Sequence, residues 1–181
     1  MTDKILVTGA TGNVGREVVR QLAAVGAPVV GAVLDDADAA RLATQQGATV
    51  ATVPFRFGAP ETYTAAFAGV DRLFLMRPPQ IADVKRYLFP VIDVAAEHGV
   101  AQIAFLSLLG AERNRMVPHY EVEQYLKAGA ISYTFLRPSF YMQNLNTTHR
   151  EEIRDDDVIA VPVGRAPTSF IDVRDIGAVA A

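Results

Sequence analysis

A glycine-rich turn near the N-terminus constrains the fold of this chain more than any other feature. Gly9, Gly12 and Gly15 follow the apolar run 5–7 and open a stretch with helical spacing. Glycines let the backbone turn sharply and approach a ligand closely, and the N-terminus of a helix attracts anions. A structural turn without a ligand is the alternative. In this strand–turn–helix setting we expect a dinucleotide pyrophosphate to bind on Gly9, Thr11, Gly12, Asn13, Val14 and Gly15.

Strand-like apolar runs alternate with helix-like stretches along most of the chain. The expected strands are 5–7, 29–34, 49–53, 73–76, 103–106 and 133–136. Residues 81–97 form one long predicted helix, which Pro90 should kink. Strands that are separated by helical connections predict an α/β fold, a Rossmann-type doubly wound parallel sheet with helices on both faces.

The length of 181 residues suits one domain with a substantial core. We assign residues 1–137 to an NAD(P)-binding Rossmann core and residues 138–181 to the start of a substrate-side segment. Asp172 is placed to cap a helix from Val173, and no helix stop signal follows it before Ala181. We therefore expect the chain to be cut within a helix, with a C-terminal lobe missing.

Composition removes several classes of function. The absence of cysteine excludes disulfides, thiolate metal sites and a thiol nucleophile, and we expect no metal site. A formal net charge of −3 gives no reason to expect direct binding to nucleic acid or to a membrane. No apolar stretch approaches the roughly 20 residues that cross a bilayer, and no signal peptide is visible. We expect a cytoplasmic protein with a small-molecule substrate, and a homo-oligomer is compatible with the sequence.

Asp35 follows the second expected strand, where an acidic residue binds the ribose hydroxyls of adenosine. A carboxylate there repels the 2′-phosphate of NADP, so the NAD(P)(H) preference leans to NAD(H). The alternative is that Asp35 caps the following helix together with Asp36. Arg56, after the third strand, is the nearest basic residue for a phosphate, and its alternative role is a surface charge.

Four segments together resemble the NmrA-like group of atypical short-chain dehydrogenases, and these segments are 7–15, 69–75, 133–138 and 170–175. The resemblance covers nearly the whole chain and is closest to the quinone-reductase branch. It implies an NAD(P)H-dependent oxidoreductase that transfers hydride to a quinone or similar small electrophile. The alternative is a non-catalytic NAD(P)-binding redox sensor that acts through a protein partner, because the family contains such members.

The resemblance also implies roles for residues that follow the later strands. Ser107 stands at the position of the family's active-site serine, beside the cofactor, and His119 with Glu123 matches an H-x-x-x-E pattern. Ser107 and His119 are therefore the catalytic candidates, which would orient or protonate a carbonyl. The alternatives are a strand-end hydroxyl for Ser107 and an exposed helix-start residue for His119. Relatives bind the cofactor at the positions of Met76, Arg77 and Pro78, and line the substrate pocket at those of Phe140, Tyr141 and Asn144.

The chain departs from the family pattern in its proton-transfer residues. The Tyr-x-x-x-Lys pair of the wider superfamily is absent, because Gln124 stands four residues after Tyr120. Glu121 replaces the lysine base of the related reductases, and Asp35 replaces the usual arginine for the 2′-phosphate. Hydride transfer is the chemistry of the nicotinamide itself, and a quinone acceptor can take its proton from solvent. The departures therefore weigh against alcohol oxidation more than against quinone reduction.

Overall fold

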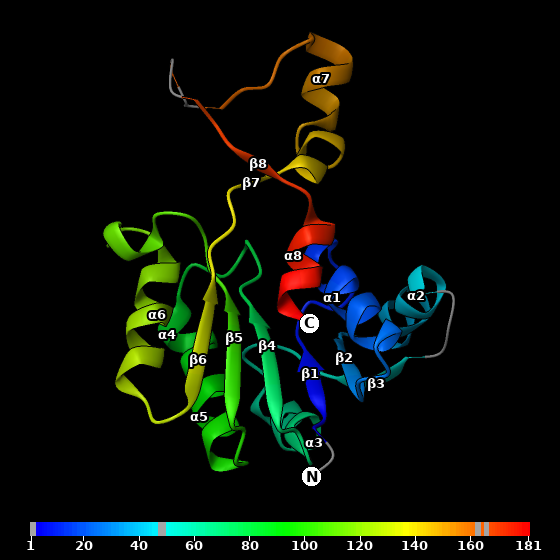
Figure 1. The fold of residues 1–181 in the computed structure, drawn as a ribbon, viewed down its shortest axis with the longest axis vertical. Helices are drawn as coiled ribbons and strands as arrows, with labels where there is room; N and C mark the ends of the chain where they lie inside the picture. The colour runs from blue at the N-terminus through cyan, green and yellow to red at the C-terminus, as the bar shows by residue number, and fades with distance from the viewer. Residues whose placement is uncertain (1–2, 47–49, 162–163, 165–166) are drawn as a thin grey trace.

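A six-stranded parallel sheet forms the centre of the molecule in the computed structural model (Figure 1), which describes residues 3–46, 50–161, 164 and 167–181. The strand order is β3-β2-β1-β4-β5-β6. This order reverses between β1 and β4, as in Rossmann domains, and confirms the predicted fold class. The strands are β1 (Ile5–Val7), β2 (Val29–Val33), β3 (Ala51–Pro54), β4 (Arg72–Met76), β5 (Gln102–Leu106) and β6 (Ser132–Leu136).

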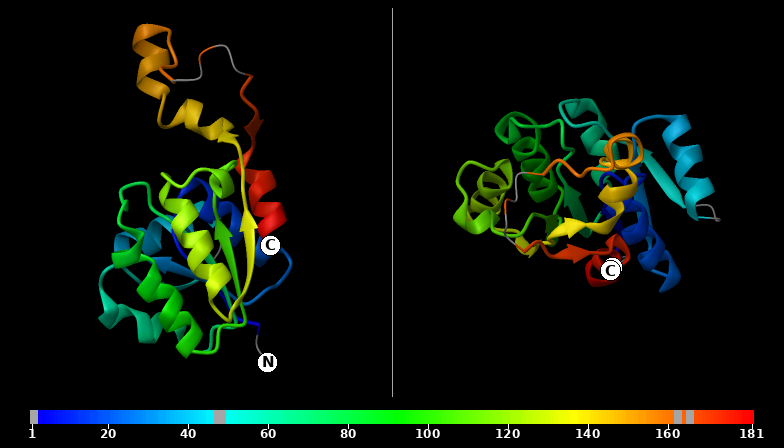
Figure 2. Two further views of the ribbon diagram at one scale, coloured as in Figure 1. Left: turned by 90° about the vertical axis from the view of Figure 1, so that its left-hand side faces the viewer. Right: turned by 90° about the horizontal axis from the view of Figure 1, so that it is seen from above.

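Helices cover both faces of this sheet, and a hydrophobic core lies on each side of it (Figure 2). The first core contains Phe67 and Phe105, and the second contains Val18, Phe74 and Ile176. On the first face lie α3 (Tyr63–Phe67), α4 (Val84–Tyr87), α5 (Phe89–Glu97) and α6 (Pro118–Ala128). On the second face lie α1 (Asn13–Ala24), α2 (Asp36–Gln46) and α8 (Val173–Ala180). Short 3-10 helices are found at Pro60–Thr62, Ala111–Arg113 and Met142–Asn146.

The predicted helix over 81–97 is two helices in the structure. α4 ends at Tyr87 and α5 begins at Phe89, with Pro90 in the first turn of α5. Proline has no N–H to continue the hydrogen bonds of α4, but it is well suited to the first turn of a new helix. The expected kink is therefore a break at Leu88, two residues before the proline.

A small projecting segment lies beyond the carboxyl ends of the main strands. β7 (Phe140–Tyr141) and β8 (Phe170–Ile171) pair in parallel there, and α7 (Arg150–Asp156) extends further from the sheet (Figure 1). The chain then returns to the core through α8, which packs along α1. Of the described residues after 137, Val173 and Ile176 of α8 thus belong to the second core, and Tyr141 of β7 and Ile171 of β8 pack against it.

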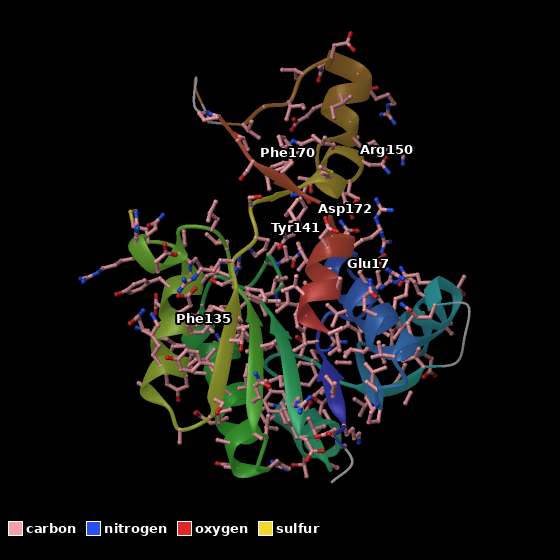
Figure 3. All side chains as sticks on the ribbon, in the orientation of Figure 1. Glu17, Phe135, Tyr141, Arg150, Phe170 and Asp172 are labelled. Atoms are coloured by element: carbon pink, nitrogen blue, oxygen red, sulfur yellow. The ribbon has the colours of Figure 1, made fainter. Side chains whose placement is uncertain are left out.

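The start of α8 confirms one prediction from the sequence. The Asp172 side chain accepts a hydrogen bond from the N–H of Arg174 at 2.8 Å and caps the helix. Further along, a Cβ at Gly177 would lie 2.9 Å from the carbonyl carbon of Glu17 on α1. The two helices therefore approach backbone to backbone, and glycine makes this approach possible. Figure 3 labels Glu17 on α1 beside α8.

Among the described residues, no helix combines the length and the apolar character needed to cross a membrane.

Candidate dinucleotide and substrate site

The glycine turn joins β1 to α1 at the carboxyl edge of the sheet. Gly9 has a positive φ of 61°, and Gly12 donates its N–H to the Gly9 carbonyl at 2.9 Å. A Cβ at Gly15 would lie only 2.0 Å from the same carbonyl oxygen, so α1 begins directly against the turn. Gly12 is the N-cap residue, and the first N–H groups of a helix have no acceptor within the helix. The N–H groups from Asn13 onward are thus placed to bind an anion.

The ends of β1 and β4 are joined by Thr8. Its hydroxyl donates to the Phe74 carbonyl at 3.1 Å and accepts the N–H of Met76 at 2.9 Å. The Met76 side chain packs over the turn, because its sulfur lies 2.6 Å from the place of a Cβ on Gly9. The structure therefore brings Met76 and the glycine turn together at the point where the strand order reverses, which is where ligands bind in open α/β sheets.

Arg77 shapes the loop after β4. Its Nη1 donates to the carbonyl oxygens of Pro78, Pro79 and Ile81 at 3.1, 3.1 and 2.6 Å. Its Nε is buried without a hydrogen-bond partner among the described residues, and burial lowers the pKa of Arg77. Arg77 thus holds Pro78 and the loop in place from the inside, and direct contact of Arg77 or Pro78 with a dinucleotide stays a prediction.

Asp35 acts as a helix cap in this structure. Its Oδ1 accepts the N–H of Asp38 at 2.9 Å, which satisfies a free donor in the first turn of α2. This is the alternative role that the sequence left open, and one cap bond does not use all the acceptor capacity of a carboxylate. Pro54 pairs with Val33 where β3 and β2 end, so Arg56, two residues after Pro54, lies near Asp35. The side chain of Arg56 is exposed. The roles of Asp35 and Arg56 toward adenosine stay predictions.

Asp38 is a buried acidic residue beside the glycine turn, and it was not among the predicted site residues. It accepts hydrogen bonds from the Thr11 hydroxyl at 2.9 Å and the Leu34 N–H at 3.1 Å, and it pairs with Arg41. Burial raises the pKa of Asp38, but these three donors outweigh burial and lower it. The carboxylate is therefore ionised and fixes Thr11 to α2. The sequence signal for Asp38 was its spacing. It stands three residues after the cap residue Asp35 and three before Arg41, with which it can pair on one helix face.

Ser107 lies at the end of β5 and is buried, with 2% of its surface exposed. Its hydroxyl donates to Oε1 of Glu123 on α6 at 2.6 Å. Arg137, which follows β6, donates to both carboxylate oxygens of Glu123, at 2.8 Å from Nε and 2.6 Å from Nη2. An ionised carboxylate only accepts hydrogen bonds, so the Ser107 proton is directed at Glu123. This geometry does not fit the expectation that Ser107 protonates a substrate.

His119 lies at the start of α6 and is half-buried. Its alternative role, an exposed residue at a helix start, required an exposed side chain. Burial and the nearby charge of Arg77 lower the pKa of His119 to about 4, although Glu123 acts in the opposite direction. Nδ1 is buried without a partner among the described residues, and the ring lies 5.9 Å from that of Phe105. Near neutral pH only about one molecule in a thousand carries the imidazolium, so His119 is a poor acid there.

The predicted substrate residues line one cavity of about 600 Å³ beyond the ends of β5 and β6. Phe140, Tyr141 and Asn144 are among its lining residues, Leu108 and Leu109 contribute from the loop after β5, and the segment before β8 contributes Pro167, Thr168 and Ser169. Figure 3 shows Tyr141 between the main sheet and α7. Burial raises the pKa of the Tyr141 phenol, so this group is neutral. The structure brings the three residues together, and their contact with a substrate stays a prediction.

A comparison with known families decides the assignment of the chain. The model of the NmrA-like family matches residues 1–181. The chain belongs to the NmrA-like family. The resemblance seen in four segments of the sequence is thereby confirmed over the whole chain.

Individual relatives of this NmrA-like chain include reductases. It is 34% identical over 180 residues to NAD(P)H azoreductase of Xenophilus azovorans, which covers 97% of this chain and 61% of that protein. It is 33% identical over 177 residues to Prestalk A differentiation protein A of Dictyostelium discoideum, with coverages of 96% and 56%. A solved Escherichia coli NADPH-dependent quinone oxidoreductase in complex with NADPH has a TM-score of 0.82 at 28% identity, with coverages of 97% and 62%. The chain thus spans about three fifths of the length of these relatives.

The described part of this NmrA-like chain has no group of three or more side chains suited to a metal ion. Its polar groups are instead arranged in two separate places along the carboxyl edge. Asp38 and Arg41 lie beside the glycine turn, and Glu123 and Arg137 lie below the cavity. Arg137 was also not predicted as a site residue. Its signal was its place directly after a strand, in the same position as Ser107.

Proposed function

We propose that this chain binds a nicotinamide dinucleotide across the carboxyl edge of its sheet and delivers hydride to a small electrophile such as a quinone. One observation carries the proposal. The glycine turn and the cavity of about 600 Å³ lie at the same edge, with the end of β4 between them. The NAD(P)H-dependent azo and quinone reductases among the relatives support the reaction class.

The dinucleotide would lie along this edge with its adenosine end near β2 and β3 and its nicotinamide end near β5 and β6. Its adenosine would face Asp35 and Arg56 at the ends of β2 and β3, and its pyrophosphate would accept N–H groups from α1. Its nicotinamide would then pass Met76 and reach the cavity beyond β5 and β6. Phe140 and its neighbours Leu108 and Leu109 give this cavity apolar walls, which suit the flat ring of a quinone.

Hydride transfer to a quinone requires no acid on the protein. A bound nicotinamide would supply the hydride, and the hydroquinone anion formed from the quinone would take its proton from water. The available side chains fit this scheme. Ser107 donates to Glu123, His119 is neutral near pH 7, and Tyr141 is a neutral phenol with a raised pKa. We therefore propose solvent, and none of these three side chains, as the proton source.

A redox sensor that binds the dinucleotide without turnover is the second candidate. It is favoured by the burial of Ser107, which stands at the position of the family's active-site serine. Only 2% of the Ser107 surface is exposed, and its hydroxyl donates to Glu123. A sensor of this kind would change its contacts with a protein partner when NADH or NADPH binds. It needs the same pyrophosphate site, so the two candidates differ only at the cavity.

Anaerobic stopped-flow mixing separates the two candidates. The chain loaded with NADH or NADPH is mixed with 2-methyl-1,4-naphthoquinone, other quinones and an azo dye, and nicotinamide absorbance is followed. We expect oxidation of the nucleotide, and Phe140→Ala should raise the KM for the quinone while leaving nucleotide binding unchanged. Met116→Ala, at a side chain that is 93% exposed, is the matched control. Nucleotide binding without oxidation by any acceptor would contradict hydride transfer and support the sensor.

The cofactor preference is a finer part of the same proposal. Asp35, Asp36 and Asp38 lie around the first turn of α2, and Arg41 is paired with Asp38. The nearby charge is therefore negative overall, which disfavours the 2′-phosphate of NADPH. We propose that this chain prefers NADH, in contrast to the NADPH-bound quinone oxidoreductase that it resembles.

A further inference from the structure

The carboxylate of Glu123 is a fully buried charge whose partners directly precede residues that line the cavity. None of its surface is exposed, and its partners come from two different strand ends. Removing one partner from a buried ion pair is far more costly than loss of a surface pair, because the remaining charge is left uncompensated. Burial raises the pKa of Glu123, but hydrogen bonds from Arg137 and Ser107 outweigh it and lower the pKa. The group is therefore ionised and accepts from both partners.

The two partners stand directly before the walls of the cavity. Ser107 precedes Leu108 and Leu109, and Arg137 precedes the segment 138–141. A backbone hydrogen bond also joins the two walls, from the Leu109 N–H to the Pro138 carbonyl at 3.0 Å. Glu123 is not itself a lining residue, and it binds the two adjacent segments that form these walls from outside the cavity. Pro167, Thr168 and Ser169 line another part of the cavity.

We propose that Glu123 is a positioning residue that fixes the two walls of the acceptor cavity by binding Ser107 and Arg137 together. This inference rests on the proposed function for its consequence, which is that Glu123 controls binding of the electrophile and not of the dinucleotide. The glycine turn lies after β1, on the other side of β4 from the two strand ends that Glu123 joins. Ser107 on this account is an anchor, and its hydroxyl proton is not delivered to a substrate.

Glu112 is a second carboxylate that can bind Arg137 when Glu123 is replaced, and this makes Glu123→Gln an informative variant. Glu112 lies 3.6 Å from Nε of Arg137 and is more exposed than Glu123. In Glu123→Gln, the amide can accept from Ser107, but its NH₂ group opposes the Arg137 donors. Arg137 should then turn to Glu112 and release the second wall. Glu112→Gln is the matched control, because it removes a carboxylate from Arg137 and leaves the pair with Glu123 intact.

Amide hydrogen exchange tests this clamp, the contacts of Glu123 with Ser107 and Arg137, without relying on turnover. In Glu123→Gln we expect faster exchange, by about tenfold or more, in peptides that cover 107–110 and 137–141. Exchange in the glycine-turn peptide 9–16 should not change, and Glu112→Gln should match the wild type throughout. If Glu123→Gln does not fold, Arg137→Lys keeps the charge but loses the two-point contact, and it should show a smaller change of the same kind. Unchanged exchange in the wall peptides, or equal acceleration everywhere, would overturn the proposal.

Steady-state kinetics then test the consequence for the acceptor. With 2-methyl-1,4-naphthoquinone, Glu123→Gln should raise KM by about tenfold and leave the Kd of NADH within about twofold. Ser107→Ala removes one of the two partners of Glu123, so it should also raise the quinone KM and leave the Kd of NADH within about twofold. A purely structural role would move the Kd of NADH as much as the quinone KM, and would contradict the proposal. Faster exchange in the walls together with no quinone reduction by the wild type would overturn the proposed reaction and keep the clamp.

Discussion

The carbonyl oxygen of Gly9 occupies the space that a side chain at Gly15 would need. The distance from this oxygen to the place of a Cβ on Gly15 is 2.0 Å, far below any normal contact. The first turn of α1 is therefore pressed against the turn that precedes it, and its N–H groups lie at the edge of the sheet. The proposed dinucleotide site depends on this backbone contact more than on any side chain.

The contact predicts the effect of a side chain at Gly15. Gly15→Val must push α1 away from Gly9, so we expect loss of binding of both NADH and NADPH by at least about a hundredfold, on the order of 3 kcal/mol. Gly129→Ala is the control, because its Cβ would lie 3.6 Å from the nearest atom, the Leu126 carbonyl oxygen. Fluorescence titration of the nucleotides measures both variants, and tight binding by Gly15→Val would refute the proposed position of the pyrophosphate.

The charge of Asp35 predicts a change in cofactor preference. Asparagine is as good a helix cap as aspartate, so Asp35→Asn should keep the bond to the Asp38 N–H and the stability of α2. Loss of the negative charge should shift the ratio of NADPH to NADH affinity toward NADPH by roughly threefold to tenfold. Calorimetric titration of both nucleotides gives the ratio. A wild type that already prefers NADPH would leave Arg56 as the candidate phosphate ligand and contradict the role of Asp35.

The close approach of α8 to α1 predicts a stability defect. A Cβ at Gly177 would meet the main chain of Glu17 at 2.9 Å, and backbone cannot move aside as a flexible side chain can. We expect Gly177→Ala to lower the free energy of unfolding by about 1–3 kcal/mol in urea titrations. Val179→Ala, at an exposed position of the same helix, should change it by less than about 0.5 kcal/mol. Equal stability of the two variants would show that α8 does not dock as described.

His119 predicts a loss of stability on the acid side. Its pKa is about 4 in the folded protein, against 6.5 for an unperturbed histidine, so the unfolded chain takes up the proton first as the pH falls. His119 therefore has no effect above about pH 6.5 and destabilises the fold progressively between about pH 6.5 and 4. Between about pH 7.5 and 5, wild type should lose roughly 1 kcal/mol more than His119→Gln, after a discount for partial solvent exposure. Parallel pH profiles of the two proteins would contradict the buried, neutral state.

Much of the fold was predictable because its signals are local. The glycine turn, the alternation of strands and helices, and the Asp172 cap each depend on a few consecutive residues. The position of α8 depends on contact between residues far apart in the chain, such as Gly177 and Glu17, which no local pattern records. Pro90 shows an intermediate case, because the proline predicted a disturbance but not a full break at Leu88.

The site was predicted less completely, for a similar reason. Residues that follow strands can be located from the sequence, and Phe140, Tyr141 and Asn144 do line one cavity. Hydrogen-bond partners depend on which helix face meets which strand end. Thus the sequence places Ser107 at a strand end but does not show that its proton is directed at Glu123, nor that Arg137 completes the pair.

Calorimetric titration of the wild-type chain with NADH and with NADPH tests the central claim most directly. We expect saturable binding of one dinucleotide per chain, tighter for NADH, and loss of this binding in Gly15→Val. If a folded sample in the calorimeter bound neither nucleotide at millimolar concentration, the proposed dinucleotide site would be contradicted.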